Sequence, residues 1–195
     1  LRSDQTGISN YWIYGIHATL AALKNPSRKC IRVVATSKFL GTHAQSHGLG
    51  GAEVKERAEI DDLLPNGAVH QGLAGLFKPL SSLPLAQVLE RAKGLKRASI
   101  VVLDQATDPR NIGAVLRSAS GFGVSCLVIQ DRYAPPETGL MAKAASGALE
   151  TIPIVRITNL ARGLAKIKEY GFWCIGLDAS AEITLAKTQL DGKIA

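Results

Sequence analysis

A polar segment that follows an apolar one contains the residues best placed for chemistry. Residues 104–111 read Asp-Gln-Ala-Thr-Asp-Pro-Arg-Asn, directly after an apolar run that begins at Ser99. Arg110 and Arg117 are seven residues apart, so a helix would carry both on one face. Two guanidinium groups on one stripe could hold phosphates. A solvated helix face shows the same pattern, and the residues alone leave both interpretations open.

The residues around these arginines predict the helix that must position them. Its apolar face follows the spacing i, i+3, i+4, i+7 and i+10. Asp108 and Pro109 are suited to the N-cap and first helical positions, and Gly123 is placed to end the helix. The apolar positions are Ile112, Val115, Leu116, Ala119 and Phe122.

Apolar runs of strand length recur after residue 98 and alternate with helical patterns. This alternation predicts a parallel β-sheet covered by helices on both faces. One of the helices is expected from about Asn159 to Tyr170, capped by Thr158 or Asn159 and ended by Gly171. Ligands bind beyond the carboxyl ends of such strands, which favours residues 104–117, 130–136 and 177–180. The predicted strands are Ser99–Asp104, Val124–Ile129, Ile152–Ile157 and Phe172–Leu177.

The first 79 residues predict a smaller α/β domain. A helix is expected over Ile16–Lys24, and strands over Ile31–Thr36 and His70–Phe77. Two prolines and two serines then interrupt regular structure at residues 77–84. We therefore predict an N-terminal domain at 1–79, a linker with a short helix at 80–97, and a second domain at 98–195.

Composition limits the class of protein. The chain has 195 residues, of which 46% are hydrophobic and 20% charged, as in a folded globular protein and unlike a disordered one. No apolar run approaches the roughly 18 residues of a membrane span, and Leu1–Asn10 is too polar for a signal peptide. A soluble, cytoplasmic protein without a membrane partner is the expectation.

Charge and cysteine usage add little on their own. The net charge of +7 is spread over both halves and suits contact with a polyanion such as RNA, although a solubility charge explains it equally well. Cys30, Cys126 and Cys174 are odd in number and far apart, which favours buried free thiols. Without paired Cys or His spacing, we expect no metal site.

Motifs for other chemistries are missing from the positions where they would be needed. No GxGxxG or GxxxxGK[ST] motif joins a strand to a helix, which disfavours Rossmann-type and P-loop enzymes. Gly121 and Gly123 are better explained by helix capping. His70 has apolar neighbours, so a structural histidine at a strand end is more plausible than a catalytic one. No catalytic triad or carboxylate pair is indicated.

The segment Leu103–Ala119 closely resembles the first signature of the SpoU-type, or TrmH-type, RNA ribose 2′-O-methyltransferases of the SPOUT class. Its core is an Asn, a Gly and an Arg-Ser-Ala group at the spacing of Asn111, Gly113 and Arg117. Lys143–Glu150 is similar to the Lys-x-Ser-x-Gly-Ala segment of that family. Tyr14–Ala18 and His70–Gly72 resemble the N-terminal domain of the subgroup that methylates a guanosine of 23S ribosomal RNA.

This resemblance implies the fold and the partners. The fold would be α/β, with a small N-terminal α/β RNA-binding domain and a C-terminal parallel-sheet SPOUT domain that forms an α/β trefoil knot. The protein would be a homodimer that binds S-adenosylmethionine and acts on 23S ribosomal RNA.

The resemblance also implies roles for individual residues. Arg117 would stand at the ribose 2′-hydroxyl and Asn111 beside the site. Arginine stays protonated, so we expect Arg117 to act by electrostatics more than as a base. Cofactor-binding residues would be Gly176, Leu177 and Asp178. Residues expected to contact RNA are Arg110, Arg132, Lys143, His70 and Gln71.

One departure from the family pattern affects these expectations. The second signature, with its Leu-Gly-x-Glu-Gly loop, and the third, with its Ser-Leu-Asn, are not found before Ala195. We therefore expect the printed chain to stop before the knot and to hold only part of a cofactor pocket. Alternative functions are the same chemistry on transfer RNA or another ribosomal site, or non-catalytic RNA binding.

Overall fold

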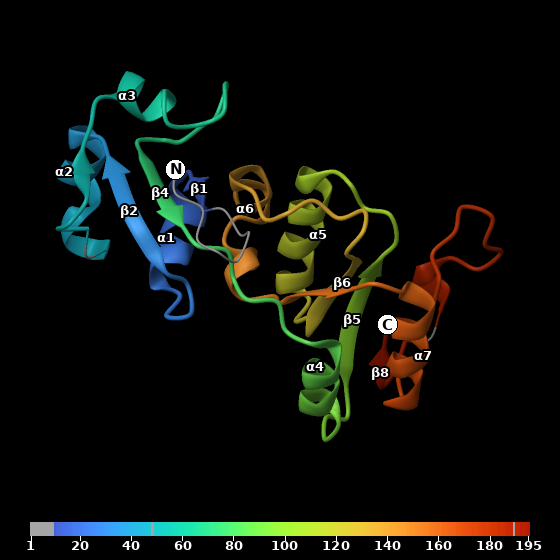
Figure 1. Cartoon of the computed structure of the whole chain (residues 1–195). Helices are drawn as coiled ribbons and strands as arrows, with labels where there is room; N and C mark the ends of the chain where they lie inside the picture. Colours follow the sequence, from blue (N-terminus) through green and yellow to red (C-terminus); the bar gives the residue numbers. More distant parts are fainter. Residues whose placement is uncertain (1–9, 48, 189) are drawn as a thin grey trace. The chain divides into compact units, whose positions relative to one another are not determined.

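A computed structural model describes residues 10–47, 49–188 and 190–195 (Figure 1). Residues 1–9, on which the expectation of no signal peptide depends, lie outside the described part. No described helix is long and apolar enough to cross a membrane. The elements in chain order are β1 (Tyr11–Tyr14), α1 (Ile16–Lys24), β2 (Cys30–Ala35), α2 (Ser37–His47), β3 (Glu53–Val54), α3 (Arg57–Asp61), β4 (Leu73–Phe77), α4 (Leu85–Ala92), β5 (Ala98–Leu103), α5 (Pro109–Gly121), β6 (Cys126–Gln130), α6 (Gly139–Ala145), η1 (Ala148–Glu150), β7 (Ile154–Ile157), α7 (Leu160–Glu169), η2 (Leu185–Lys187) and β8 (Lys193–Ile194).

The chain divides into two compact units that are interleaved along the sequence. The first unit contains residues up to Ser81 together with Asp108–Ser118 and Pro135–Thr151. The second unit contains Ser82–Thr107, Ala119–Ala134 and Ile152–Ala195. Most of α5 and all of α6 therefore belong to the same unit as the N-terminal sheet, whereas the domains predicted from the sequence are consecutive.

The first unit is built on a mixed sheet with the strand order β1-β4-β2-β3. β4 runs antiparallel to both β1 and β2, and β2 is parallel to β3. Central β4 is almost entirely buried, which its sequence Leu-Ala-Gly-Leu-Phe allows on both faces. Buried side chains from β1, β2, α3 and β4, including Tyr14, Val34 and Ile60, form part of the core.

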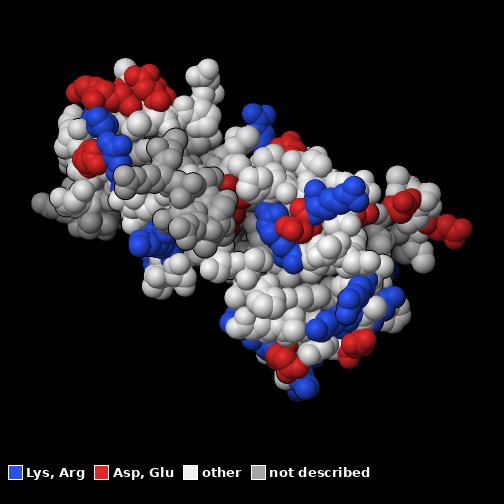
Figure 2. Space-filling view, viewed as in Figure 1, with Lys and Arg blue, Asp and Glu red and all other residues white. Residues whose placement is uncertain are grey.

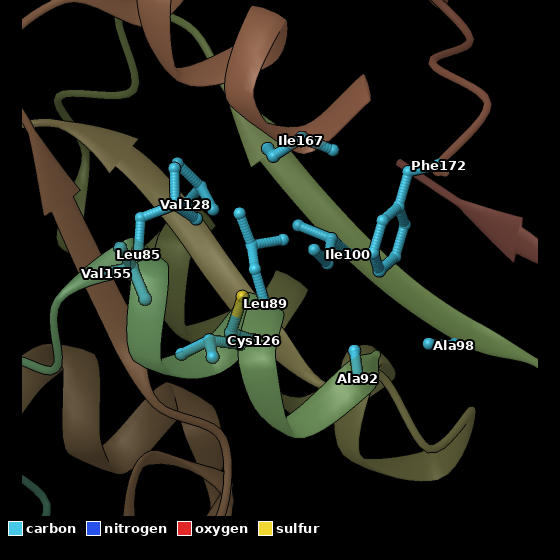
Figure 3. Packing of buried hydrophobic residues seen from close by; sticks show 11 residues of the cluster. Leu85, Leu89, Ala92, Ala98, Ile100, Cys126, Val128, Val155, Ile167 and Phe172 are labelled. Carbon is cyan, nitrogen blue, oxygen red and sulfur yellow. The ribbon is translucent and has the colours of Figure 1, made fainter. Parts of the chain in front are cut away.

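The second unit contains the predicted parallel sheet, with the order β7-β6-β5-β8. Cys126–Ile129 of β6 are all buried, as a continuous apolar run predicts for a central parallel strand. One cluster of buried side chains joins α4, β5, β6, β7 and α7, and in Figure 3 Leu89, Ile100 and Val128 point toward one another. This core confirms the α/β class predicted for the second half of the chain.

The strand predicted over Phe172–Leu177 is confirmed only in part, because a short bridged stretch takes the place of a full strand. Phe172 is buried in the core of the second unit, but Trp173 is 74% exposed and Leu177 is 76% exposed. Trp173 forms a parallel bridge with Ile194, and backbone hydrogen bonds of 2.8–2.9 Å join Trp173 and Ile175 to residues 193–195. The fourth strand of the sheet is β8. The apolar run contributes Phe172 to the core and the partly buried Cys174 against it, but Trp173 and Leu177 face solvent, so its composition overstated its burial.

The other predicted elements differ from the structure mainly at their ends. The strand expected from His70 begins only at Leu73, because Gln71 and Gly72 both have positive φ angles and form a turn. Helices α2 and α3 were not predicted. Of the three free cysteines, Cys126 is buried and burial raises its thiol pKa to about 12, but Cys30 is exposed, contrary to the expectation.

Candidate functional site

Helix α5 positions the arginines and the asparagine of the predicted site. The Oδ1 atom of Asp108 accepts a hydrogen bond from the Arg110 backbone N–H at 2.8 Å, which confirms the predicted N-cap. Ile112 and Leu116 are fully buried, whereas Arg110, Asn111 and Arg117 are exposed. The helix therefore has the two faces that its sequence predicted. Phe122, expected on the apolar face, lies past the end of the helix and is 86% exposed.

Asn111 and Arg117 have side chains that are available to a ligand. Within the described residues, neither side chain makes a hydrogen bond or an ion pair. Arg110 lies near Tyr14, where its positive charge partly offsets the rise that burial causes in the pKa of the Tyr14 hydroxyl. The outer face of α5 thus presents two guanidinium groups and an amide to solvent.

Helix α6 carries Lys143 and is held by caps at both ends. The Thr138 hydroxyl accepts a hydrogen bond from the Met141 N–H at 3.2 Å. Ser146 ends the helix in the left-handed conformation with φ 51°, and Gly147 follows with φ 99°. The family-like segment 143–150 is therefore a helix end followed by a tight turn and the short helix η1.

The segments that carry Lys143 and Arg117 are in direct contact. A Cβ atom at Gly113 of α5 would lie 2.5 Å from the carbonyl oxygen of Met141 in α6. Only glycine allows two helix backbones to come this close. The two segments that resemble family signatures therefore pack backbone to backbone within the first unit.

Lys143 also meets a residue predicted to contact RNA. Its Nζ atom donates a hydrogen bond to Oε1 of Gln71 at 2.7 Å, and the same oxygen accepts the Ile16 N–H at 3.3 Å. The side chain of Lys143 lies over Gly15, at the start of α1. Partial burial lowers the pKa of Lys143, and no carboxylate pairs with it within the described residues. This site combines a lysine, an exposed amide and a helix N-terminus.

His70, the neighbouring residue, is placed differently. Its side chain is fully buried, its Nδ1 atom accepts the Gly72 N–H at 3.2 Å, and its Nε2 atom lies 3.2 Å from Oδ1 of Asp61. The ring and the carboxylate are within ion-pair distance but are not aligned for a hydrogen bond. A buried ring offers no surface to RNA. His70 supports the turn that exposes Gln71, as expected for a structural histidine.

The remaining predicted residues belong to the second unit. Arg132 is exposed after β6, and its guanidinium lies 5.6 Å from the centre of the Tyr133 ring. Gly176, Leu177 and Asp178 are exposed, and the Asp178 carboxylate accepts hydrogen bonds from Ser180.

These three residues do not by themselves fit a cofactor the size of S-adenosylmethionine. Nothing lies within 4 Å of a Cβ built at Gly176, so residues 176–178 form no enclosed site. The described residues also contain no group of three or more His, Cys, Asp or Glu side chains that could hold a metal ion.

The charge on the surface is mixed rather than gathered into one basic patch on the face that Figure 2 shows. Acidic side chains cluster over α3, where Glu56, Glu59, Asp61 and Asp62 are exposed. Over the second unit, basic and acidic groups alternate. The excess of seven positive charges is distributed, as the sequence indicated.

Sequence reasoning missed a buried polar network around Arg28. This residue bonds to Glu137 and Glu150, which are 109 and 122 residues away in the chain. Neither periodicity nor any motif marks an arginine for burial, and most arginines are exposed. No signal in the sequence alone identified it.

Comparison with known proteins identifies the family of this chain. Residues 98–195 match the model of the SpoU rRNA Methylase family. The chain is 32% identical over 194 residues to the 23S rRNA (guanosine-2′-O-)-methyltransferase RlmB of Vibrio cholerae, covering 96% of this chain and 78% of that protein. It is 31% identical over 190 residues to RlmB of Escherichia coli K12, covering 94% and 77%. The chain belongs to the SpoU rRNA methylase family.

Solved structures share the fold at lower identity. The SpoU methyltransferase AviRb from Streptomyces viridochromogenes, in complex with AdoMet, has a TM-score of 0.72 at 13% identity, covering 95% of this chain and 71% of that one. The AdoMet-bound rRNA methyltransferase from Sinorhizobium meliloti has a TM-score of 0.70 at 19% identity, covering 95% and 68%. These similarities establish the methyltransferase fold.

Proposed function

We propose that this protein transfers a methyl group from S-adenosylmethionine to the ribose 2′-oxygen of a guanosine in 23S ribosomal RNA. The relatives named RlmB support the reaction and the substrate, and the AdoMet-bound neighbours support the cofactor. The single observation in the structure that carries the proposal is the exposed face of α5, with Asn111 and Arg117 in the segment that resembles the first family signature.

The role of Arg117 follows from its chemistry. A ribose 2′-hydroxyl is a weak nucleophile, and negative charge develops on its oxygen as it attacks a methyl group. S-adenosylmethionine supplies that methyl group on a sulfonium. A permanently charged guanidinium with no partner within the described residues can stabilise the oxygen or hold the adjacent phosphate. Asn111, near the start of the same helix, adds an amide that can orient the ribose.

The RNA-facing residues proposed from the sequence extend this surface. Lys143 and Gln71 form one hydrogen-bonded pair, and Arg110 lies on α5. Lysine and arginine contacts to phosphates supply sequence-independent affinity. Arg132 is proposed as a further contact from the second unit. We also propose that the protein acts in the cytoplasm as a homodimer, the assembly that the family resemblance implies.

The test uses the whole protein and RNA transcribed in vitro, which carries no modifications. We would incubate 23S rRNA, 16S rRNA and transfer RNA separately with methyl-labelled S-adenosylmethionine. A 2′-O-methyl group protects the adjacent phosphodiester bond from alkaline cleavage, so a single protected guanosine in 23S rRNA is expected. Protection in transfer RNA or 16S rRNA instead would favour the alternative substrates. Salt-sensitive RNA binding without transfer to any RNA would favour a non-catalytic RNA-binding protein.

A further inference from the structure

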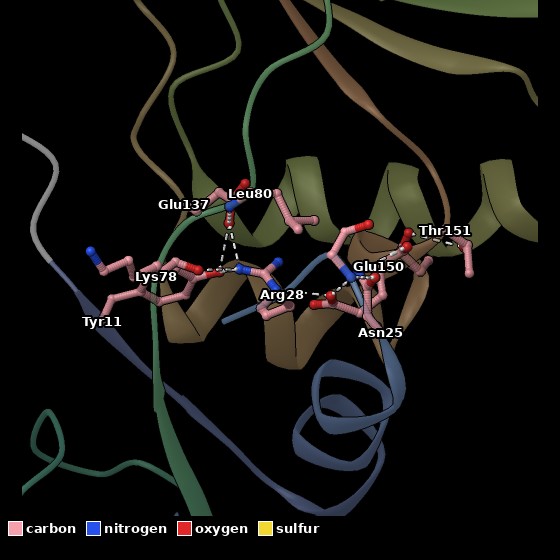
Figure 4. Close-up of polar contacts among 10 residues, drawn as sticks. Tyr11, Asn25, Arg28, Lys78, Leu80, Glu137, Glu150 and Thr151 are labelled. Atoms are coloured by element: carbon pink, nitrogen blue, oxygen red, sulfur yellow. Dashed lines mark hydrogen bonds and ion pairs between the residues drawn. The ribbon is translucent and has the colours of Figure 1, made fainter. Parts of the chain in front are cut away.

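An arginine of the first unit is buried between two carboxylates. The side chain of Arg28, which lies between α1 and β2, is 0% exposed. Its Nε atom donates to Oε2 of Glu150 at 2.8 Å, and its Nη1 atom donates to Oε2 of Glu137 at 3.0 Å. The two carboxylates are themselves only 5% and 12% exposed. Figure 4 shows the guanidinium between the two acidic side chains.

Neighbouring groups from the N-terminal segment complete the network. The Tyr11 hydroxyl donates to Glu137 at 2.7 Å and accepts from Arg28 Nη1 at 2.9 Å. The Asn25 amide donates to Glu150 at 2.8 Å. Burial alone would lower the pKa of Arg28. The hydrogen bond to Glu150 and the nearby negative charges outweigh this effect, so the pKa of Arg28 is raised above its usual range. The guanidinium is therefore charged at every physiological pH.

The two carboxylates stand at opposite ends of one short segment. Glu137 precedes α6 by two residues, and Glu150 is the last residue of η1. Arg28 therefore bonds to the segment on both sides of Lys143. Between Glu137 and Glu150, Gly139 packs against the Trp12 carbonyl oxygen and the Tyr14 ring. This glycine contact allows α6 to lie directly on β1.

Stability is a poor explanation for this arrangement. One guanidinium and two carboxylates leave a net charge of −1 in the interior, and Arg28 Nη2 has no hydrogen-bond partner within the described residues. Buried ion networks of this kind are often no more stable than apolar side chains of the same volume. What a rigid forked guanidinium provides, and apolar packing does not, is a fixed direction toward two acceptors.

The position that the network fixes is that of the candidate site. Helix α6 carries Lys143, which bonds to Gln71, and α6 packs against Gly113 of α5. Helix α5 carries Asn111 and Arg117. A displacement of α6 relative to the N-terminal sheet would therefore separate Lys143 from Gln71 and move α5.

We propose that Arg28 is a positioning residue for methyl transfer. By holding Glu137 and Glu150, it fixes α6 on the N-terminal sheet and so sets the places of Lys143 and Arg117. Arg28 contacts neither RNA nor cofactor. This inference rests on the proposed function, because it assigns Arg28 a part in that reaction.

The main test removes the charges of Arg28, Glu137 and Glu150 together, because Arg28→Met alone would leave two buried carboxylates without their cationic partner. In the whole protein, the variant Arg28→Met/Glu137→Gln/Glu150→Gln is expected to keep its melting midpoint within a few degrees. Its kcat should fall at least tenfold, with an unchanged KM for S-adenosylmethionine. Arg28→Lys keeps the charge but lacks the fork, and should give an intermediate kcat. If the triple variant does not fold, the kcat of Arg28→Lys is the test, and an unchanged kcat in that variant would contradict the proposal.

A readout independent of activity is amide hydrogen exchange. The Ala142 N–H bonds to the Thr138 carbonyl at 2.9 Å within α6 and is expected to exchange at least tenfold faster in the triple variant. The Val128 amide in β6 should exchange within twofold of its rate in the unaltered protein. Because this measurement needs neither RNA nor cofactor, it tests whether the Arg28 network holds α6 in place even if the proposed function fails.

An ion pair on the neighbouring strands β2 and β3 provides a matched control for the removal of charges. Arg32 and Glu53 form a two-pronged ion pair at 2.6 and 2.7 Å on the surface. Arg32→Met/Glu53→Gln should change neither kcat nor exchange at Ala142. An unchanged kcat and unchanged α6 exchange in a folded triple variant would overturn the proposal. So would an equal loss of kcat in the control pair.

Discussion

Gly113 of α5 faces Ala144 of α6 so closely that a Cβ atom at residue 113 would lie 2.6 Å from the Ala144 Cβ. Two segments about thirty residues apart in the chain thus share a backbone contact, and both resemble signatures of the family. The contact couples the helix that bears Arg117 to the helix that bears Lys143. A methyl group added at residue 113 would meet both the Met141 carbonyl oxygen and the Ala144 side chain.

Gly113→Ala is therefore expected to destabilise the protein. The added methyl group meets backbone and a Cβ atom that cannot move away cheaply, so we expect a loss of about 1–3 kcal/mol in the free energy of unfolding. Urea denaturation measures it. Gly121→Ala in the same helix is the control, since nothing lies within 4 Å of a Cβ there, and it should be neutral or slightly stabilising. Equal stability of the two variants would contradict the close packing.

Arg117→Ala is expected to abolish methyl transfer while the fold is retained. The side chain is exposed and unpaired within the described residues, so its removal should change stability by no more than about 0.5 kcal/mol. Single-turnover methylation and RNA affinity would be measured together, and most RNA binding should remain. Arg162→Ala, an exposed arginine on α7, serves as the control. Full activity in the Arg117 variant would remove it from the proposed mechanism.

Lys143→Met is expected to weaken RNA binding and to reduce its salt dependence. A lysine that neutralises one phosphate contributes about 0.7–0.9 to the slope of log K against log salt concentration. The slope should therefore become shallower by roughly one unit. Lys168→Met, an exposed lysine on α7, is the control for the loss of net charge. Parallel salt plots for the Lys143 variant and the unaltered protein would show that Lys143 contacts no phosphate.

The stability of the protein should fall in mild acid because of His70. Burial lowers the pKa of this ring more than the Asp61 carboxylate raises it, so the folded state binds the proton less tightly than the unfolded state. The stabilisation is present above the unfolded pKa of about 6.5 and is lost as pH falls toward the lower folded value. His70→Asn should make the free energy of unfolding less dependent on pH between 7.5 and 5.5.

His17→Asn is the matched control for this titration, because His17 is exposed on α1. If the two asparagine variants had the same profile, the acid sensitivity would have to come from groups other than His70.

Local signals in the sequence were sufficient for several elements. Helix α1 occupies the predicted residues Ile16–Lys24, and α7 begins after Asn159, whose side chain accepts the Arg162 N–H at 2.9 Å. The cap at Asp108 and the buried face of α5 were likewise readable. These features depend on neighbours within one or two helical turns, which is the range over which side-chain type controls backbone conformation.

Predictions that needed distant partners were less accurate. The apolar run Phe172–Leu177 has the composition of a core strand, but β8 supplies the fourth strand of the sheet and leaves Trp173 and Leu177 exposed. Helix α2 was not predicted, since its sequence contains Gly41 and few apolar residues. Whether such a segment is buried depends on what the rest of the chain places beside it.

The sequence by itself determined the family, the α/β class and the face of α5 that carries Asn111 and Arg117. Only the tertiary structure decided that Lys143 meets Gln71, that His70 is buried, and that Arg28 joins the N-terminal sheet to both ends of α6. The physical reason is separation along the chain. A local pattern fixes periodicity and caps, whereas a buried ion network exists only when folding brings together charges more than a hundred residues apart and shields them from water.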